Sequence, residues 1–499
     1  MDPRLRTFLI GSIAAGMAVW VGIAIANEEY LLATLAGTLC TAGVVAWIGG
    51  PIAEAWILAF LVFAYIIGNR GFAQVTPVGG MPLFFGELGL ASSLALVTFR
   101  HAMQQELPWR RDWLNSLILL LLVLGAGRMV FDVRVYGVLA LRDFAMIYYA
   151  LFFFIAQSAT AHDASRRLFA TGLTVTFTLL PATSLLADIF PELFFRNLTV
   201  RGVPLILYKG DLLATFQFAG FFWLLPRGRF DWRWDWWRGL LAVLSLTLAL
   251  YNVSRAGMMG LMVALLWLIF ARWFRPLLVT TVLCGCGVVG AMLYSVMQEK
   301  DITQTRVYAI YEHVQSVVDF SGTMAYQNPD AEDSGDNNRF RLVWWKTIVN
   351  ETLAGGPVFG LGFGHDIARG FVLAYDPLME GDFTARSPHS ILFTMFGRMG
   401  FIGLLVWLSI MVVMAREFLR FAGNVRHEHT PEIRELMVLI AMCWVVLVSA
   451  CFGVVLEGPM GAIPFWVILG VAHGEIRRLT PSEPDPEAAA VPVFTANAV

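Results

Sequence analysis

Three residues combine reactive chemistry with positions at the edges of apolar segments: Arg255, Arg341 and His389. Arg255 lies in a minimal turn, residues 252–257, which places its guanidinium at or just below the headgroup level of a bilayer. Arginine suits a diphosphate, because its planar group donates two hydrogen bonds at once and keeps its charge. The alternative is an arginine that only reaches toward the membrane surface or pairs with an acidic neighbour.

His389 follows Arg386-Ser387-Pro388, where a polar segment re-enters an apolar one. We therefore expect the imidazole at the first turn of a helix, at the membrane–water boundary. Because imidazole exchanges a proton near neutral pH, we interpret His389 as a general base. The alternative is a histidine that only caps or packs the start of the helix.

A glycine run, residues 360–364, precedes His365. It follows no βαβ pattern and lacks the GxGxxG spacing, so a nucleotide-binding loop is excluded. We expect a tight turn near the membrane, in which the glycines allow close approach of the backbone.

The composition requires a membrane to position these residues. The 499 residues are 58% hydrophobic and only 14% charged, with a mean hydropathy of +0.67, which excludes an ordinary soluble enzyme. The net charge of −2 points to no nucleic acid or other charged partner. All five cysteines lie in apolar runs, where we expect small core residues and no disulfide framework.

Fourteen apolar segments are candidate membrane spans. They cover residues 7–26, 31–50, 52–68, 82–99, 113–127, 143–158, 168–187, 211–225, 238–252, 256–271, 276–297, 390–414, 436–455 and 460–474. The first is interpreted as an uncleaved signal anchor. The sequence thus predicts an all-α, polytopic membrane protein with about twelve to fourteen transmembrane helices.

Short basic loops alternate with neutral or acidic ones along the chain, which predicts cytoplasmic N- and C-termini. One outer segment, residues 298–389, is long and polar, with helical patterns at about residues 304–320 and 338–353. The acidic stretch at residues 330–336 is interpreted as a solvated loop, and the tail, residues 479–499, as disordered.

Sixteen of the 35 basic residues fall on the predicted outer side, against the usual bias. Arg339, Arg341, Arg142, Arg201 and Arg398 are among them, and all are candidates for contacts with an anionic substrate. No outer carboxylates have the spacing of a metal site, apart from residues 330–336.

Four motifs in this order resemble the bacterial O-antigen ligase and polysaccharide-polymerase superfamily. They are Ser254-Arg255-Ala256-Gly257; Arg341 followed by Trp345, with Arg339 as a neighbouring candidate; the glycines 360, 362 and 364; and His389 with Gly400 and Gly403. The resemblance covers residues 240–405. Ser390 replaces the family's asparagine, and Arg398 replaces an acidic residue, which indicates either a different acceptor or a further phosphate contact.

The resemblance implies a GT-C-like membrane glycosyltransferase that moves a glycan from a polyprenyl diphosphate to an acceptor hydroxyl, with inversion and without a metal or other cofactor. It implies an inner-membrane protein whose site faces the periplasm, with His389, Arg255 and Arg341 as catalytic residues. Ser254, Trp345 and the remaining candidate arginines are assigned to substrate binding. The acceptor is either another lipid-linked repeat or lipid A core.

The predicted organisation has an N-terminal transmembrane bundle (1–237), a catalytic region (238–405), C-terminal helices (406–478) and the tail. A transporter or flippase of lipid-linked oligosaccharides is the main alternative, but it predicts ionisable residues near mid-membrane. Here the charges inside spans are few and lie mostly near their ends, as at Glu54 and Glu87. A scaffold without chemistry is the third possibility.

Overall fold

The computed structural model of the chain describes residues 30–76, 84–104, 111–226, 231–252, 254–298, 301–318, 324, 326, 329–375, 386–425 and 430–480. Within these ranges the protein consists of helices and one short antiparallel hairpin of β1 (Thr199–Val200) and β2 (Val203–Pro204). The prediction of an all-α membrane protein is confirmed.

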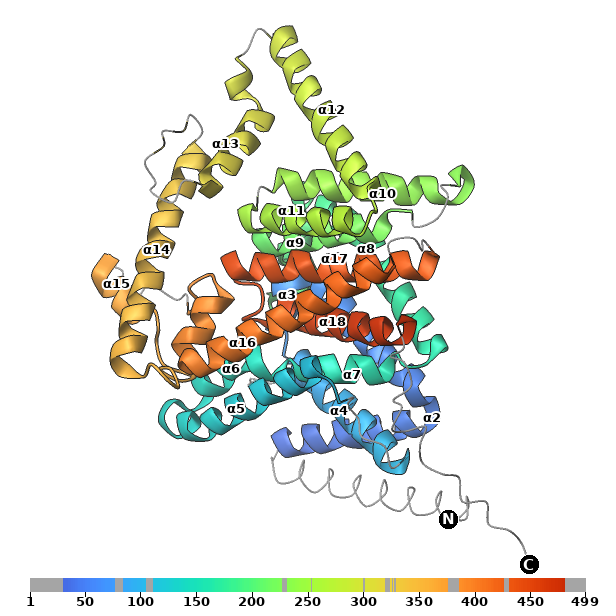
Figure 1. Cartoon of the computed structure of the whole chain (residues 1–499), viewed down its shortest axis with the longest axis vertical. Helices are drawn as coiled ribbons and strands as arrows, with labels where there is room; N and C mark the ends of the chain where they lie inside the picture. The colour runs from blue at the N-terminus through green and yellow to red at the C-terminus, as the bar shows by residue number, and fades with distance from the viewer. Residues whose placement is uncertain are drawn as a thin grey trace, which may run out of the picture.

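The helices of the bundle and of the long polar segment follow one another along the chain (Figure 1). They are α2 (Tyr30–Ile67), α3 (Asn69–Gln74), α4 (Phe85–Gln104), α5 (Trp113–Tyr136), α6 (Val138–Tyr148), α7 (Leu151–Ala159), α8 (Asp163–Ile189), η1 (Leu193–Asn197), α9 (Gly210–Leu224), α10 (Trp232–Tyr251), α11 (Arg255–Phe270), α12 (Arg275–Gln298), η2 (Ile302–Gln304), α13 (Arg306–Val318), α14 (Pro329–Gly355), α15 (Arg369–Tyr375), α16 (Ile391–Asn424), α17 (Pro431–Phe452) and α18 (Pro459–Leu479).

Thirteen of the fourteen predicted spans coincide with these helices, and the segment 7–26 lies outside the described residues. In the described part of the chain, seven helices are long and apolar enough to cross a membrane, or eight if the bent pair α6 and α7 forms one span. The helix α11 is apolar but has only 16 residues. The chain is therefore a multi-pass membrane protein, and the total of twelve to fourteen spans stays a prediction.

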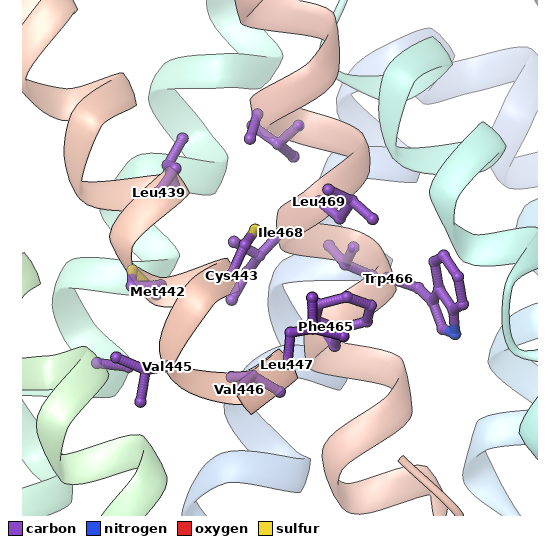
Figure 2. Packing of buried hydrophobic residues seen from close by; sticks show 14 of the residues in the cluster. Leu439, Met442, Cys443, Val445, Val446, Leu447, Phe465, Trp466, Ile468 and Leu469 are labelled. Atoms are coloured by element: carbon purple, nitrogen blue, oxygen red, sulfur yellow. The ribbon is translucent and has the colours of Figure 1, made fainter. Parts of the chain in front are cut away.

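The core lies where α9, α17 and α18 pack against the helices around them. Every residue of α9 from Leu212 to Leu224 is buried, so this mostly apolar helix packs on all sides rather than along one stripe. Side chains of α17 and α18 interdigitate beside it, as Cys443, Leu447 and Phe465 show in Figure 2. Such packing fixes the ends of these helices relative to one another. The start of α9 carries Lys209 and Asp211, and the turn between α17 and α18 carries Glu457.

The cysteines only partly follow the prediction. Cys443 is a buried core residue as expected, but Cys284 and Cys286 are exposed on α12, and Cys451 is partly buried. The difference arises because α12 packs little against the bundle and is exposed along most of its length. All four of these thiols are free.

The polar segment between α12 and α16 forms α13, α14 and α15, which lie at the end of the bundle where α11 and α16 begin (Figure 1). The acidic stretch, residues 330–336, belongs to α14 and not to a separate loop, which corrects the prediction. Pro329 starts this helix, and proline suits a first helical position because its φ is already helical. The rings of Trp344 in α14 and Phe371 in α15 stack with their centroids 5.0 Å apart, within a small separate hydrophobic core.

Candidate functional site

Arg255 occupies the first residue of α11, and the hydroxyl of Ser254 caps that helix by accepting a hydrogen bond from the Gly257 amide at 3.1 Å. Such a cap satisfies one of the amides that a helix start leaves unpaired, so Ser254 fixes where α11 begins. Ser254 is buried, and its role in this structure is to position Arg255.

Arg341 reaches from α14 to the end of α17, where its Nη1 donates to the carbonyl of Phe452 at 2.8 Å. Its Nε is buried and has no hydrogen-bond partner. Burial lowers the pKa of Arg341, and the carboxylate of Asp211 opposes that shift. The like charges of Arg255 and Arg341 repel each other, so the two guanidiniums together favour an anion between them.

His389 has an unusual backbone conformation, with φ at +57°. A residue other than glycine pays about 1–3 kcal/mol for such a conformation, and it persists only where the surroundings enforce it. The indole of Trp345 donates to the carbonyl of Pro388 at 2.7 Å, and the ring of Trp344 lies 6.1 Å from the imidazole. Two aromatic residues of α14 therefore fix the segment that carries the histidine.

The imidazole of His389 is neutral at physiological pH. Burial and, after it, the positive charges of Arg341 and Lys209 together lower its pKa to about 4, against the opposing effect of Asp211. Its Nδ1 is buried and has no hydrogen-bond partner. The ring can thus accept a proton from a group that enters the site.

The structure therefore brings together the three predicted catalytic residues from α11, α14 and the start of α16. Three further charged residues lie with them, and we call the six the polar cluster. Its members are Lys209, Asp211, Arg255, Arg341, His389 and Glu457.

Lys209 and Asp211 stand at the start of α9, where their side chains form an ion pair at 3.3 Å. Lys209 also donates to the carbonyl of Val454 at 3.1 Å. The sequence assigned neither residue a role. Their position at the end of a helix that is buried on all sides was the available signal.

Glu457 was missed by the sequence analysis. It lies in the turn between α17 and α18, where its Oε1 accepts hydrogen bonds from Ser387 Oγ at 2.9 Å and Thr394 Oγ1 at 3.2 Å. Burial raises the pKa of its carboxyl to about 7, against the effect of these hydroxyls and of Lys209. A single acid in a short apolar loop is weak evidence in a sequence, because nothing there shows what it faces.

Other predicted substrate contacts lie apart from the polar cluster. Arg142 is exposed on α6, and Arg201 is exposed in the β1–β2 turn, where it donates to the Thr76 carbonyl at 3.4 Å. Arg339 belongs to α14, but its side chain lies outside the described residues.

Arg398 belongs to a separate ion cluster inside the protein. It is 2% exposed and pairs with Asp143 at 2.8 Å, and Arg386 pairs with the same carboxylate at 3.1 Å. Arg398 also donates to the carbonyls of Gly362 and His365. Its guanidinium is therefore occupied by protein groups, unlike the free position that a phosphate contact requires.

The glycine run forms the expected tight turn. Gly360, Gly362 and Gly364 all have positive φ, at +76°, +96° and +87°. The Phe363 amide donates to Asp132 of α5 at 2.7 Å, and the Gly364 amide donates to Asp143 of α6 at 2.9 Å. The turn thus attaches the polar segment to the first half of the bundle.

Among the side chains that the structure describes, no three His, Cys, Asp or Glu are grouped to hold a metal ion. The polar cluster instead offers three cationic side chains and one neutral imidazole. This arrangement can bind an anion and accept a proton beside it.

No curated protein matches the chain. A family model described as O-Antigen ligase matches residues 240–408. The matched segment includes Arg255, Arg341 and His389, and it lies in a multi-pass membrane protein. The match supports a role in glycan transfer during polysaccharide assembly. Through residues 240–408, the chain is similar to the O-antigen ligase family.

Proposed function

We propose that the protein transfers a glycan from a polyprenyl diphosphate to an acceptor hydroxyl, as a polymerase or ligase of surface polysaccharide. One observation carries the proposal: a half-buried, neutral His389 lies in one cluster with the guanidiniums of Arg255 and Arg341. A proton acceptor beside two cations is what the transfer from a diphosphate to a hydroxyl requires.

In the proposed reaction, the acceptor oxygen attacks the anomeric carbon while the bond from that carbon to the diphosphate breaks. His389 takes the hydroxyl proton, which is worth about 10²–10⁴ in rate. The diphosphate leaves with the bonding electrons, and Arg255 and Arg341 neutralise the charge that it gains. A single displacement of this kind inverts the anomeric centre, and the two arginines supply the charge that a metal would otherwise provide.

The proposed site consists of these three residues, with Ser254 and Trp345 holding Arg255 and the His389 segment in place. Arg339, Arg142 and Arg201 are proposed to meet the charged substrate outside the polar cluster. Arg398 is not part of the proposed site, because Asp143 and backbone carbonyls occupy its guanidinium.

We further propose that the protein lies in a bacterial inner membrane, with both termini in the cytoplasm and the polar cluster facing the periplasm. The short basic loops along the chain support this orientation. The catalytic region, residues 238–405, would then combine α11 with the polar segment and the start of α16. The regions 1–237 and 406–478 complete the bundle, and residues 479–499 form the tail.

Complementation of a deletion strain tests the proposal. Arg255→Ala, Arg341→Ala and His389→Ala should each fail to restore surface polysaccharide and should accumulate lipid-linked glycan, at wild-type protein levels. Arg196→Ala is the matched control, because Arg196 is 78% exposed and pairs only with the exposed Glu192 across a helix turn. It should complement fully.

The size of the accumulated glycan distinguishes the two acceptors. Single repeats indicate a polymerase, and long chains indicate a ligase. Full complementation by all three variants would reject the transferase proposal in favour of transport or scaffolding.

A further inference from the structure

Glu457 is a buried carboxylate that the proposed transfer does not use. Its Oε1 accepts from Ser387 and Thr394, at 2.9 and 3.2 Å, and its Oε2 is buried without a hydrogen-bond partner. The two donors come from either side of His389 in the chain. A carboxylate on the α17–α18 turn therefore binds both flanks of the segment that carries the proposed base.

Contacts within the segment that carries His389 do not by themselves hold its conformation. His389 has a φ of +57°, and Ser390 is the N-cap of α16 but makes no side-chain cap bond. The Ser390 hydroxyl is buried without a partner, and the single hydroxyl proton of Thr394 is shared between the Ser390 carbonyl at 2.9 Å and Glu457 Oε1 at 3.2 Å. A strained residue beside an unused cap needs external restraints, and Glu457 supplies one on either side of His389, in addition to the bond from Trp345 to the Pro388 carbonyl.

We infer that Glu457 is a positioning residue, whose carboxylate holds Ser387 and Thr394 so that the imidazole of His389 meets the acceptor hydroxyl. This inference rests on the proposed function of His389 as the base. Ser390 stands next to that histidine without contacting it through a hydrogen bond, which leaves the positioning to the neighbouring turn.

The ionised form of Glu457 suits this task better than the neutral form, because a carboxylate is the stronger acceptor. The charged and titratable groups around it come from four elements. They are Lys209 and Asp211 at α9, Cys451 of α17, Arg341 of α14, and His389 before α16. The pKa of Glu457 is about 7, which is close to neutral pH. We therefore expect the ionisation of Glu457 to control how the rate changes between pH 6 and 8.

The test uses purified full-length protein in detergent, supplied with the lipid extract of the deletion strain as source of donor and acceptor. Glu457→Ala should lower kcat by about 10–100-fold, because a small displacement of a reacting group has an effect of that size. The KM for the lipid-linked glycan should stay within about twofold of the wild-type value, since the arginines that bind the diphosphate are unchanged.

Glu457→Gln keeps a neutral acceptor and should retain a rate within about tenfold of wild type at pH 8. Its rate should be flat from pH 6 to 8, whereas the wild-type rate should fall toward that of the variant as the pH is lowered from 8 to 6 and Glu457 becomes protonated. Glu192→Ala, a substitution at an exposed ion pair, should match wild type throughout.

The double variant Ser387→Ala, Thr394→Val removes the donors instead of the acceptor and should reproduce the kcat loss of Glu457→Ala. If Glu457→Ala does not fold, the double variant still tests whether these two hydrogen bonds position His389. A wild-type kcat in the double variant overturns the inference. A Glu457→Gln variant as inactive as Glu457→Ala also overturns it, by making Glu457 the proton acceptor. An active His389→Ala variant would instead show that the proposed function is at fault.

Discussion

At the scale of single residues, the proton state of His389 follows from its neighbours. A free imidazole is half protonated near pH 6.5, but burial and the charge of Arg341 lower the pKa of His389 to about 4. The cations that we propose to bind the diphosphate therefore also keep His389 unprotonated. In the proposed reaction, diphosphate binding and proton acceptance thus depend on the same few side chains.

This shift predicts a pH-dependent stability. A histidine whose pKa falls on folding contributes its full stability above pH 6.5 and loses it as the pH falls to about 4. The loss should reach roughly 3 kcal/mol for His389. Thermal unfolding of the detergent-solubilised wild type and of His389→Gln, measured from pH 8 to 4, should give a difference that changes in this interval. Parallel curves would contradict the assigned pKa.

At the scale of elements, the glycine turn and the break in α16 fit against each other. Gly400 interrupts α16 with a φ of +63°, and the Gly360 amide lies 2.5 Å from where a side chain at Gly400 would begin. The Leu361 amide donates to the carbonyl of Gly397 at 2.7 Å, just before that break. The start of α16, which carries His389, is therefore aligned by a turn some thirty residues earlier.

Gly360→Ala should disrupt this fit, because its Cβ would lie 2.4 Å from the backbone of Arg398 and its φ is +76°. We expect a loss of about 1–3 kcal/mol in unfolding free energy, together with lower transfer activity. Gly285→Ala in α12 is the matched control, since nothing lies within 4 Å of its new methyl group. Equal thermal midpoints for the two variants in detergent would contradict the packing described here.

At the scale of the whole molecule, Asp143 joins two halves of the chain. It lies on α6 and pairs with Arg386 and Arg398, which flank His389 on either side. Its carboxylate also accepts from the Gly364 amide. The N-terminal bundle thus holds the polar segment by one buried ion cluster, although the candidate residues lie in the second half of the chain.

Asp143→Asn should leave the buried guanidinium of Arg398 without its counterion. Breaking a buried pair in this way costs about 3–5 kcal/mol, far more than losing a surface pair. Tryptophan fluorescence during heating should show a much lower unfolding midpoint than for Asp188→Asn, a substitution at an exposed position on α8. An unchanged midpoint would show that Arg398 finds another partner.

The sequence by itself determined that the chain is a helical membrane protein, and it indicated three residues of the proposed site. Apolar runs long enough to span a bilayer can only be satisfied there by helices, because lipid offers no hydrogen bonds to the backbone. Arg255, Arg341 and His389 were identifiable because each combines a reactive side chain with the end of such a run. The positive φ of the glycine turn was also predictable, since glycine alone adopts it without strain.

Only the tertiary structure decided which residues meet. Lys209 and Glu457 are separated by some 250 positions, and no sequence periodicity relates them. Their proximity therefore depends on how α9, α17 and α18 pack. Arg398 has the spacing of a site residue, yet burial beside Asp143 gives it a structural partner. Local pattern specifies an element, whereas the neighbours of a side chain depend on the packing of all the elements around it.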